Sequence, residues 1–133
     1  MTLARCSLLL AAVGFAAFGV WLLVAPEALG EVGVVLSTPA ARAEIRAFYG
    51  GLELGLAAFF AVAATRPAWF APALLAQALG LGGVIVGRLT GVVVDGATDP
   101  LLLSLMAAEA GGCALGVVAL VRLPGSAAPS TGV

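Results

Sequence analysis

The sequence predicts an all-α fold, a single four-helix transmembrane bundle. Three observations predict this class: 62% of the 133 residues are hydrophobic, only 10% are charged, and the apolar residues gather in four long stretches. A soluble domain has about 45–50% apolar and about 25% charged residues. A chain this short has no interior large enough to bury the excess, so lipid must cover most of its surface.

The first two helices are expected at about residues 6–25 and 44–64. Each has the roughly 20 residues that cross a hydrocarbon core of about 30 Å. The first stretch is too long for the apolar region of a signal peptide, and no clean small-residue cleavage site comes after it. Before the second helix, Ser37 or Thr38 is suited to cap a helix with Pro39 in its first turn.

The third and fourth helices are expected at about residues 69–88 and 101–121. The third begins with aromatic residues of the kind that gather at a membrane interface. Asp99 is a candidate N-cap for the fourth helix. The four helices form one domain over residues 1–124, and the Gly/Ser/Pro/Thr-rich tail at 125–133 is predicted to be disordered.

The charges in the connections predict the topology. Basic residues without acidic neighbours stand at both ends and in the second connection: Arg5, Arg66 and Arg122. The first and third connections hold acidic residues and one arginine: Glu27, Glu31, Asp95, Asp99 and Arg42. The positive-inside rule then predicts that both termini of this multi-pass protein lie in the cytoplasm. The Ala/Gly/Val/Leu/Arg bias without lysine is typical of GC-rich bacterial genomes, so the expected location is a bacterial cytoplasmic membrane.

Composition argues against several functions. The net charge of −1 leaves no basic patch for nucleic acid. The chain has no histidine, the commonest general base and metal ligand. Its two cysteines, Cys6 and Cys113, are interpreted as small buried hydrophobes rather than a disulfide. Neither a metal nor a cofactor is expected, and no nucleophile–base pair is apparent.

Four charged residues lie inside or against the apolar stretches: Arg46, Glu53, Arg88 and Glu109. Each costs about 2.5–3.5 kcal/mol at a helix centre on insertion scales, so such residues usually face partners or water. Arg46 and Glu53 are seven residues apart and share one face of an α-helix, with Tyr49 close to that face. All five side chains are expected to form one polar cluster in the outer half of the bundle.

Two interpretations of the cluster stay open. In the first, the charges form buried ion pairs, Arg46–Glu53 and Arg88–Glu109 or the crossed partners, which fix helix rotation. In the second, they line an outward-facing pocket for a lipid head group, a quinone-like ring or a small polar solute.

Glycines recur at four-residue spacing, a pattern typical of close helix contacts in membranes. Packing within one bundle is the main expectation, and homo-oligomerisation is the alternative. The expected contact residues are Gly50, Gly51, Gly55, Gly83, Gly87, Gly112 and Gly116.

Several of these residues carry a family resemblance: Arg46-x-x-Tyr49-Gly50-Gly51, Gly87-Arg88-Leu89, Asp95-Gly96 and Glu109. Over about residues 5–123 the chain resembles the bacterial four-helix membrane family called domain of unknown function 4345. The resemblance implies an inner-membrane protein but no established activity. More distantly, Glu109 before Gly111-Gly112 is similar to DoxX-like membrane proteins, some of which are linked to quinone-associated redox systems.

The expected function is therefore that of a small membrane protein, a non-enzymatic accessory subunit or a lipid- or small-molecule-binding subunit. Membrane lipid is the expected partner, with a homo-oligomer or a larger membrane complex as further assemblies. The alternative is a small transporter or a quinone-associated membrane redox component.

Overall fold

The structure of the chain is a computed structural model, in which residues 1–123 are described. Its α-helices are α1 (Thr2–Val24), α2 (Pro39–Ile45), α3 (Leu52–Ala64), α4 (Phe70–Asp95) and α5 (Pro100–Val121), and a π-helical segment, η2 (Arg46–Gly51), joins α2 to α3. Two short 3₁₀ segments, η1 (Pro26–Val32) and η3 (Pro67–Trp69), lie in the connections. The predicted tail at 125–133 lies outside the described residues.

The all-α prediction is confirmed. Within the described residues there is no strand, and four helical units are long and apolar enough to cross a membrane. These units are Thr2–Val24, Pro39–Ala64, Pro67–Asp95 and Pro100–Val121. The chain thus has the helices of a multi-pass membrane protein.

Two of the predicted helix starts have the expected caps. The Thr38 hydroxyl oxygen accepts a hydrogen bond from the Ala41 amide at 3.1 Å, directly before Pro39. The Asp99 carboxylate accepts one from the Leu101 amide at 2.8 Å. Each cap satisfies an amide that the first helical turn leaves without a backbone acceptor.

The third helix is longer than predicted, because α4 continues to Asp95 and does not end near residue 88. It ends only where Gly96 adopts a left-handed conformation at φ +67°. The three valines before Asp95 favour a strand only weakly, and their helix penalty is a few tenths of a kcal/mol each. Its 26 residues span about 39 Å, more than a hydrocarbon core of roughly 30 Å.

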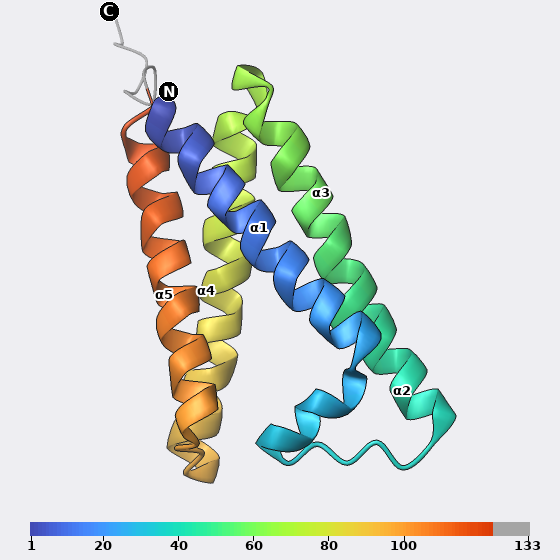
Figure 1. Cartoon of the computed structure of the whole chain (residues 1–133). Helices are drawn as coiled ribbons and strands as arrows, with labels where there is room; N and C mark the ends of the chain where they lie inside the picture. The colour runs from blue at the N-terminus through green and yellow to red at the C-terminus, as the bar shows by residue number, and fades with distance from the viewer. Residues whose placement is uncertain (124–133) are drawn as a thin grey trace, which may run out of the picture.

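The helices pack as two pairs (Figure 1). α1 lies against α3, and α4 lies against α5, while α3 and α4 touch each other little. The two pairs meet at the end that holds the N-terminus and the end of α5, and they diverge toward the end that holds η1 and α2. We call these ends of the bundle the terminal half and the loop half.

The core occupies the terminal half. Its buried residues come from the first part of α1, the last part of α3, the first part of α4 and the last part of α5. They are Ala4, Leu8, Ala11, Ala12, Phe60, Ala63, Ala64, Phe70, Ala73, Leu74 and Ala119. Most are small, so the backbones approach closely, which matters in lipid because no hydrophobic drive pulls apolar helices together.

In the loop half, α1 packs closely against η2 and the start of α3. A Cβ added at Gly19 would lie 3.0 Å from both the Glu53 Cβ and the Gly50 carbonyl oxygen. A Cβ added at Gly50 would lie 3.0 Å from Leu23. By contrast, no residue of α4 beyond Ala78 is buried, and no residue of α5 before Gly116 is buried.

A leucine at Gly19 is therefore expected to force α1 away from α3 and to lower the free energy of unfolding by about 1–3 kcal/mol. Gly14, on the same helix, has no atom within 4 Å of its Cβ position and provides the matched control. Reversible unfolding in mixed detergent micelles, followed by circular dichroism, measures both. Equal effects of Gly19→Leu and Gly14→Leu would contradict this contact.

Candidate polar site in the membrane

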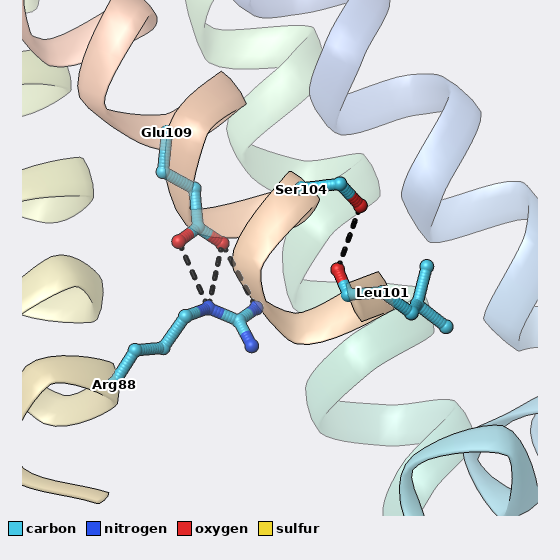
Figure 2. A network of polar contacts seen from close by, with 4 residues as sticks. All are labelled: Arg88, Leu101, Ser104 and Glu109. Carbon is cyan, nitrogen blue, oxygen red and sulfur yellow. Dashed lines mark hydrogen bonds and ion pairs between the residues drawn. The ribbon is translucent and has the colours of Figure 1, made fainter. Parts of the chain in front are cut away.

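An ion pair joins α4 and α5 in the loop half (Figure 2). The Arg88 guanidinium donates from Nε to Glu109 Oε2 at 2.9 Å and from Nη2 to Glu109 Oε1 at 2.9 Å. This two-point geometry is the strongest form of the arginine–carboxylate contact. The side chains are 21% and 17% exposed, so neither is sealed in a core.

The length of α4 decides how deep this pair lies. Arg88 stands seven residues before Asp95 at the helix end, and Glu109 stands nine residues after Pro100 at the start of α5. Because α4 and α5 are antiparallel neighbours, these offsets bring the two side chains to similar depth, about 10–14 Å along the axes. Arg88 is thus inside its span, rather than at the end where the sequence placed it.

Arg46 does not pair with Glu53. Its Nε donates a hydrogen bond to the Leu23 carbonyl oxygen at 3.0 Å, in the last turn of α1. The last carbonyls of an α-helix have no amide donor within the helix, and the Leu23 carbonyl is one of them. The helix dipole also favours a cation at this end. Arg46 therefore fastens the start of η2 to the end of α1.

A π-helical turn lies between Arg46 and Glu53. Residues Arg46–Gly51 form η2, and the Leu52 amide donates to the carbonyl of Ala47, five residues back. A π-turn inserts about one residue into the helix and so rotates the residues after it by about 100° relative to a regular α-helix. Arg46 and Glu53 nevertheless both lie against α1, Arg46 through its hydrogen bond to the Leu23 carbonyl and Glu53 through its Cβ, which would be 3.0 Å from a Cβ at Gly19.

Glu53 and Tyr49 have no direct polar partner. Neither side chain makes a hydrogen bond or ion pair with any residue that the structure describes, although Glu53 is half-buried and Tyr49 is exposed. The five predicted residues therefore divide into a closed pair, a helix cap and two unmatched groups.

A second polar junction, in the terminal half, escaped sequence reasoning. Gln77 is 1% exposed; its Oε1 accepts from the Ser7 hydroxyl at 3.2 Å and its Nε2 donates to the Gly112 carbonyl at 2.9 Å. It thereby links α1, α4 and α5. The signal available in the sequence was a glutamine within an apolar helix.

Only some of the predicted glycine contacts are found in the structure. Gly50 lies against Leu23, Gly112 against Leu81, and Gly116 against Gln77. Gly51 approaches only the Arg46 carbonyl of its own turn. The expectation of packing within one chain does not hold for the remaining three, whose Cβ positions face open space: Gly55, Gly83 and Gly87.

Other reactive groups are few. Both cysteines are free thiols, and Cys113 donates from Sγ to the Ala78 carbonyl at 3.4 Å. The sequence predicted that Cys6 is buried, but it is exposed. The Ser104 hydroxyl donates to the Leu101 carbonyl at 2.8 Å within its own helix (Figure 2). Among residues 1–123 no cluster of ligands suited to a metal ion occurs.

Comparison with known proteins addresses the resemblance seen in the motifs. The family model described as "Domain of unknown function (DUF4345)" matches residues 3–120, nearly the whole chain. The chain belongs to this family. No curated protein and no solved structure matches it. Three of the polar side chains of the loop half, Arg46, Tyr49 and Arg88, lie inside the matched region.

The Arg88–Glu109 pair is expected to be energetically coupled, because removing one partner leaves the other charge unpaired in the membrane. A double-mutant cycle with Arg88→Met and Glu109→Gln is expected to give a coupling free energy of about 1–3 kcal/mol. The losses in free energy of unfolding caused by the two single changes are then expected to add up to more than the loss caused by the double change. Additive effects, within about 0.5 kcal/mol, would show that the pair contributes no stability.

Proposed function

We propose that this protein is a non-enzymatic binding or accessory subunit of a bacterial cytoplasmic membrane. In this proposal both termini lie in the cytoplasm, and the loop half, in the outer leaflet, receives the polar group of an amphiphile. The cationic terminal end and the acidic loop end support this orientation through the positive-inside rule.

The observation that carries the proposal is Glu53. A carboxyl group inside a membrane span is costly unless it meets water, a cation or a hydrogen-bond donor. Glu53 is half-buried and has no such partner among the described residues. Since Arg88 already gives Glu109 two hydrogen bonds, Glu53 is the group left to bind something from outside the chain.

The surroundings of Glu53 favour an amphiphile over a soluble ligand. α4 and α5 expose apolar side chains in the loop half, including Val86, Leu89 and Leu103, so a molecule there contacts hydrocarbon and polar groups together. The Glu53 carboxylate accepts hydrogen bonds and favours positive charge, and the Tyr49 hydroxyl both donates and accepts. The best-matched ligand therefore has a hydroxyl or amine head on an apolar body.

The alternative, a transporter or a quinone-associated redox component, has less support. The terminal half is closed by buried small residues, and the polar groups of Ser7 and Gln77 inside it are bonded to each other. A single chain thus offers no polar path through that half. A quinone remains an acceptable amphiphile for the loop half, and its mass would distinguish it from a lipid.

Native mass spectrometry of the protein purified in mild detergent tests the proposal. Wild type is expected to retain a specific amphiphile, and Glu53→Gln is expected to reduce its retention about tenfold or more, because a hydrogen bond to a charged group contributes about 1.5–3 kcal/mol. Circular dichroism establishes that the variant is folded.

Glu44→Gln is the matched control, since Glu44 lies in the same membrane span but is exposed and is not one of the five predicted polar residues. Its retention is expected to equal that of wild type. The proposal fails if wild type carries only bulk lipid in bulk proportions, or if Glu44→Gln and Glu53→Gln lose the amphiphile equally.

A further inference from the structure

A second binding site is indicated at the opposite end of the bundle, independent of Glu53. A shallow depression of about 310 Å³ lies between the start of α1 and the end of α3, lined by Arg5, Leu9, Ala64 and Thr65. That volume falls at the lower end of the roughly 300–1,000 Å³ typical of small-molecule sites.

Arg5 is held in place at this depression by a contact within the chain. Its Nε donates to the Ala64 carbonyl oxygen at 3.1 Å, in the last turn of α3. The terminal nitrogens of the guanidinium have no other hydrogen-bond partner among the described residues. A guanidinium anchored through Nε keeps its Nη edge available, and two parallel N–H donors on that edge match the oxygens of a phosphate.

The walls of the depression combine this cation with apolar surface. Leu9 stands four residues after Arg5 and so lies on the same face of α1, one turn deeper along the helix. It is 45% exposed. The Thr65 hydroxyl already donates to the Val62 carbonyl at 2.7 Å, so it supplies no donor to an anion.

The charge of this end favours an anion. Arg66 and Arg122 lie at the same end as Arg5, and residues 1–26, 60–75 and 115–123 contain no acidic residue. Arg66 lies over the Trp69 ring, with its Cζ 5.1 Å from the ring centroid, an arrangement suited to the interface between lipid head groups and tails.

We propose that this depression binds the phosphodiester of an anionic phospholipid, with the Arg5 Nη edge on the phosphate and Leu9 against an acyl chain. A cation above an apolar wall, at the end of a membrane span, matches the order of groups along a phospholipid. The site is separate from the loop half and would anchor the terminal half to the leaflet on its side.

Native mass spectrometry in detergent with added phosphatidylglycerol, phosphatidylcholine or inorganic phosphate tests this site. Wild type is expected to retain phosphatidylglycerol at least about fivefold better than phosphatidylcholine. Arg5→Gln is expected to lower phosphatidylglycerol retention about tenfold, the loss typical of one charge-assisted contact. Arg122→Gln, the matched control outside the depression, is expected to stay within about twofold of wild type.

Leu9→Trp gives an independent test, because it fills the depression, keeps Arg5 and changes a lipid-facing position that tolerates a large apolar side chain. It is expected to reduce retention as Arg5→Gln does, and it decides the matter should Arg5→Gln fail to fold. The proposal is overturned by unchanged retention in Leu9→Trp, by equal losses in Arg5→Gln and Arg122→Gln, by equal retention of the two lipids, or by inorganic phosphate displacing phosphatidylglycerol.

Discussion

Close approach of backbones in the terminal half is the constraint on which the rest of this structure depends. Lipid offers these helices no hydrophobic reason to associate, so van der Waals contact and buried hydrogen bonds must hold them together. Alanines supply the contact, and Gln77 supplies hydrogen bonds to α1 and α5. Where these features stop, beyond Ala78 on α4, the two helix pairs diverge.

The arrangement of polar residues in the loop half is a consequence of that divergence. Arg88 and Glu109 satisfy each other across α4 and α5, and Arg46 satisfies the end of α1. Glu53 is carried by the other helix pair, where its Cβ lies against Gly19 of α1 and its carboxyl has no hydrogen bond or ion pair with any described residue.

The sequence predicted the fold class and two helix caps, because apolar length, Thr38 and Asp99 are local signals. It did not reveal the π-turn at Arg46–Gly51, because such a turn leaves no mark in hydrophobic periodicity, and it ended α4 too early, because a charged residue such as Arg88 in an apolar helix looks like a boundary. The Arg88–Glu109 contact was one of several pairings that sequence left open. Selecting it required the relative depth of two helices, which depends on where α4 ends.

Accessibility to dissolved oxygen, measured by electron paramagnetic resonance on single spin labels along α4 in bicelles, tests most directly whether packing between the two helix pairs is confined to the terminal half. The structure predicts deep minima at Ala73, Leu74, Gln77 and Ala78, and only shallow minima on the α5-facing side from residue 81 to residue 92. Minima of equal depth along the whole helix would contradict it, because they would mean that the loop half is closed and that Glu53 is covered by the chain itself.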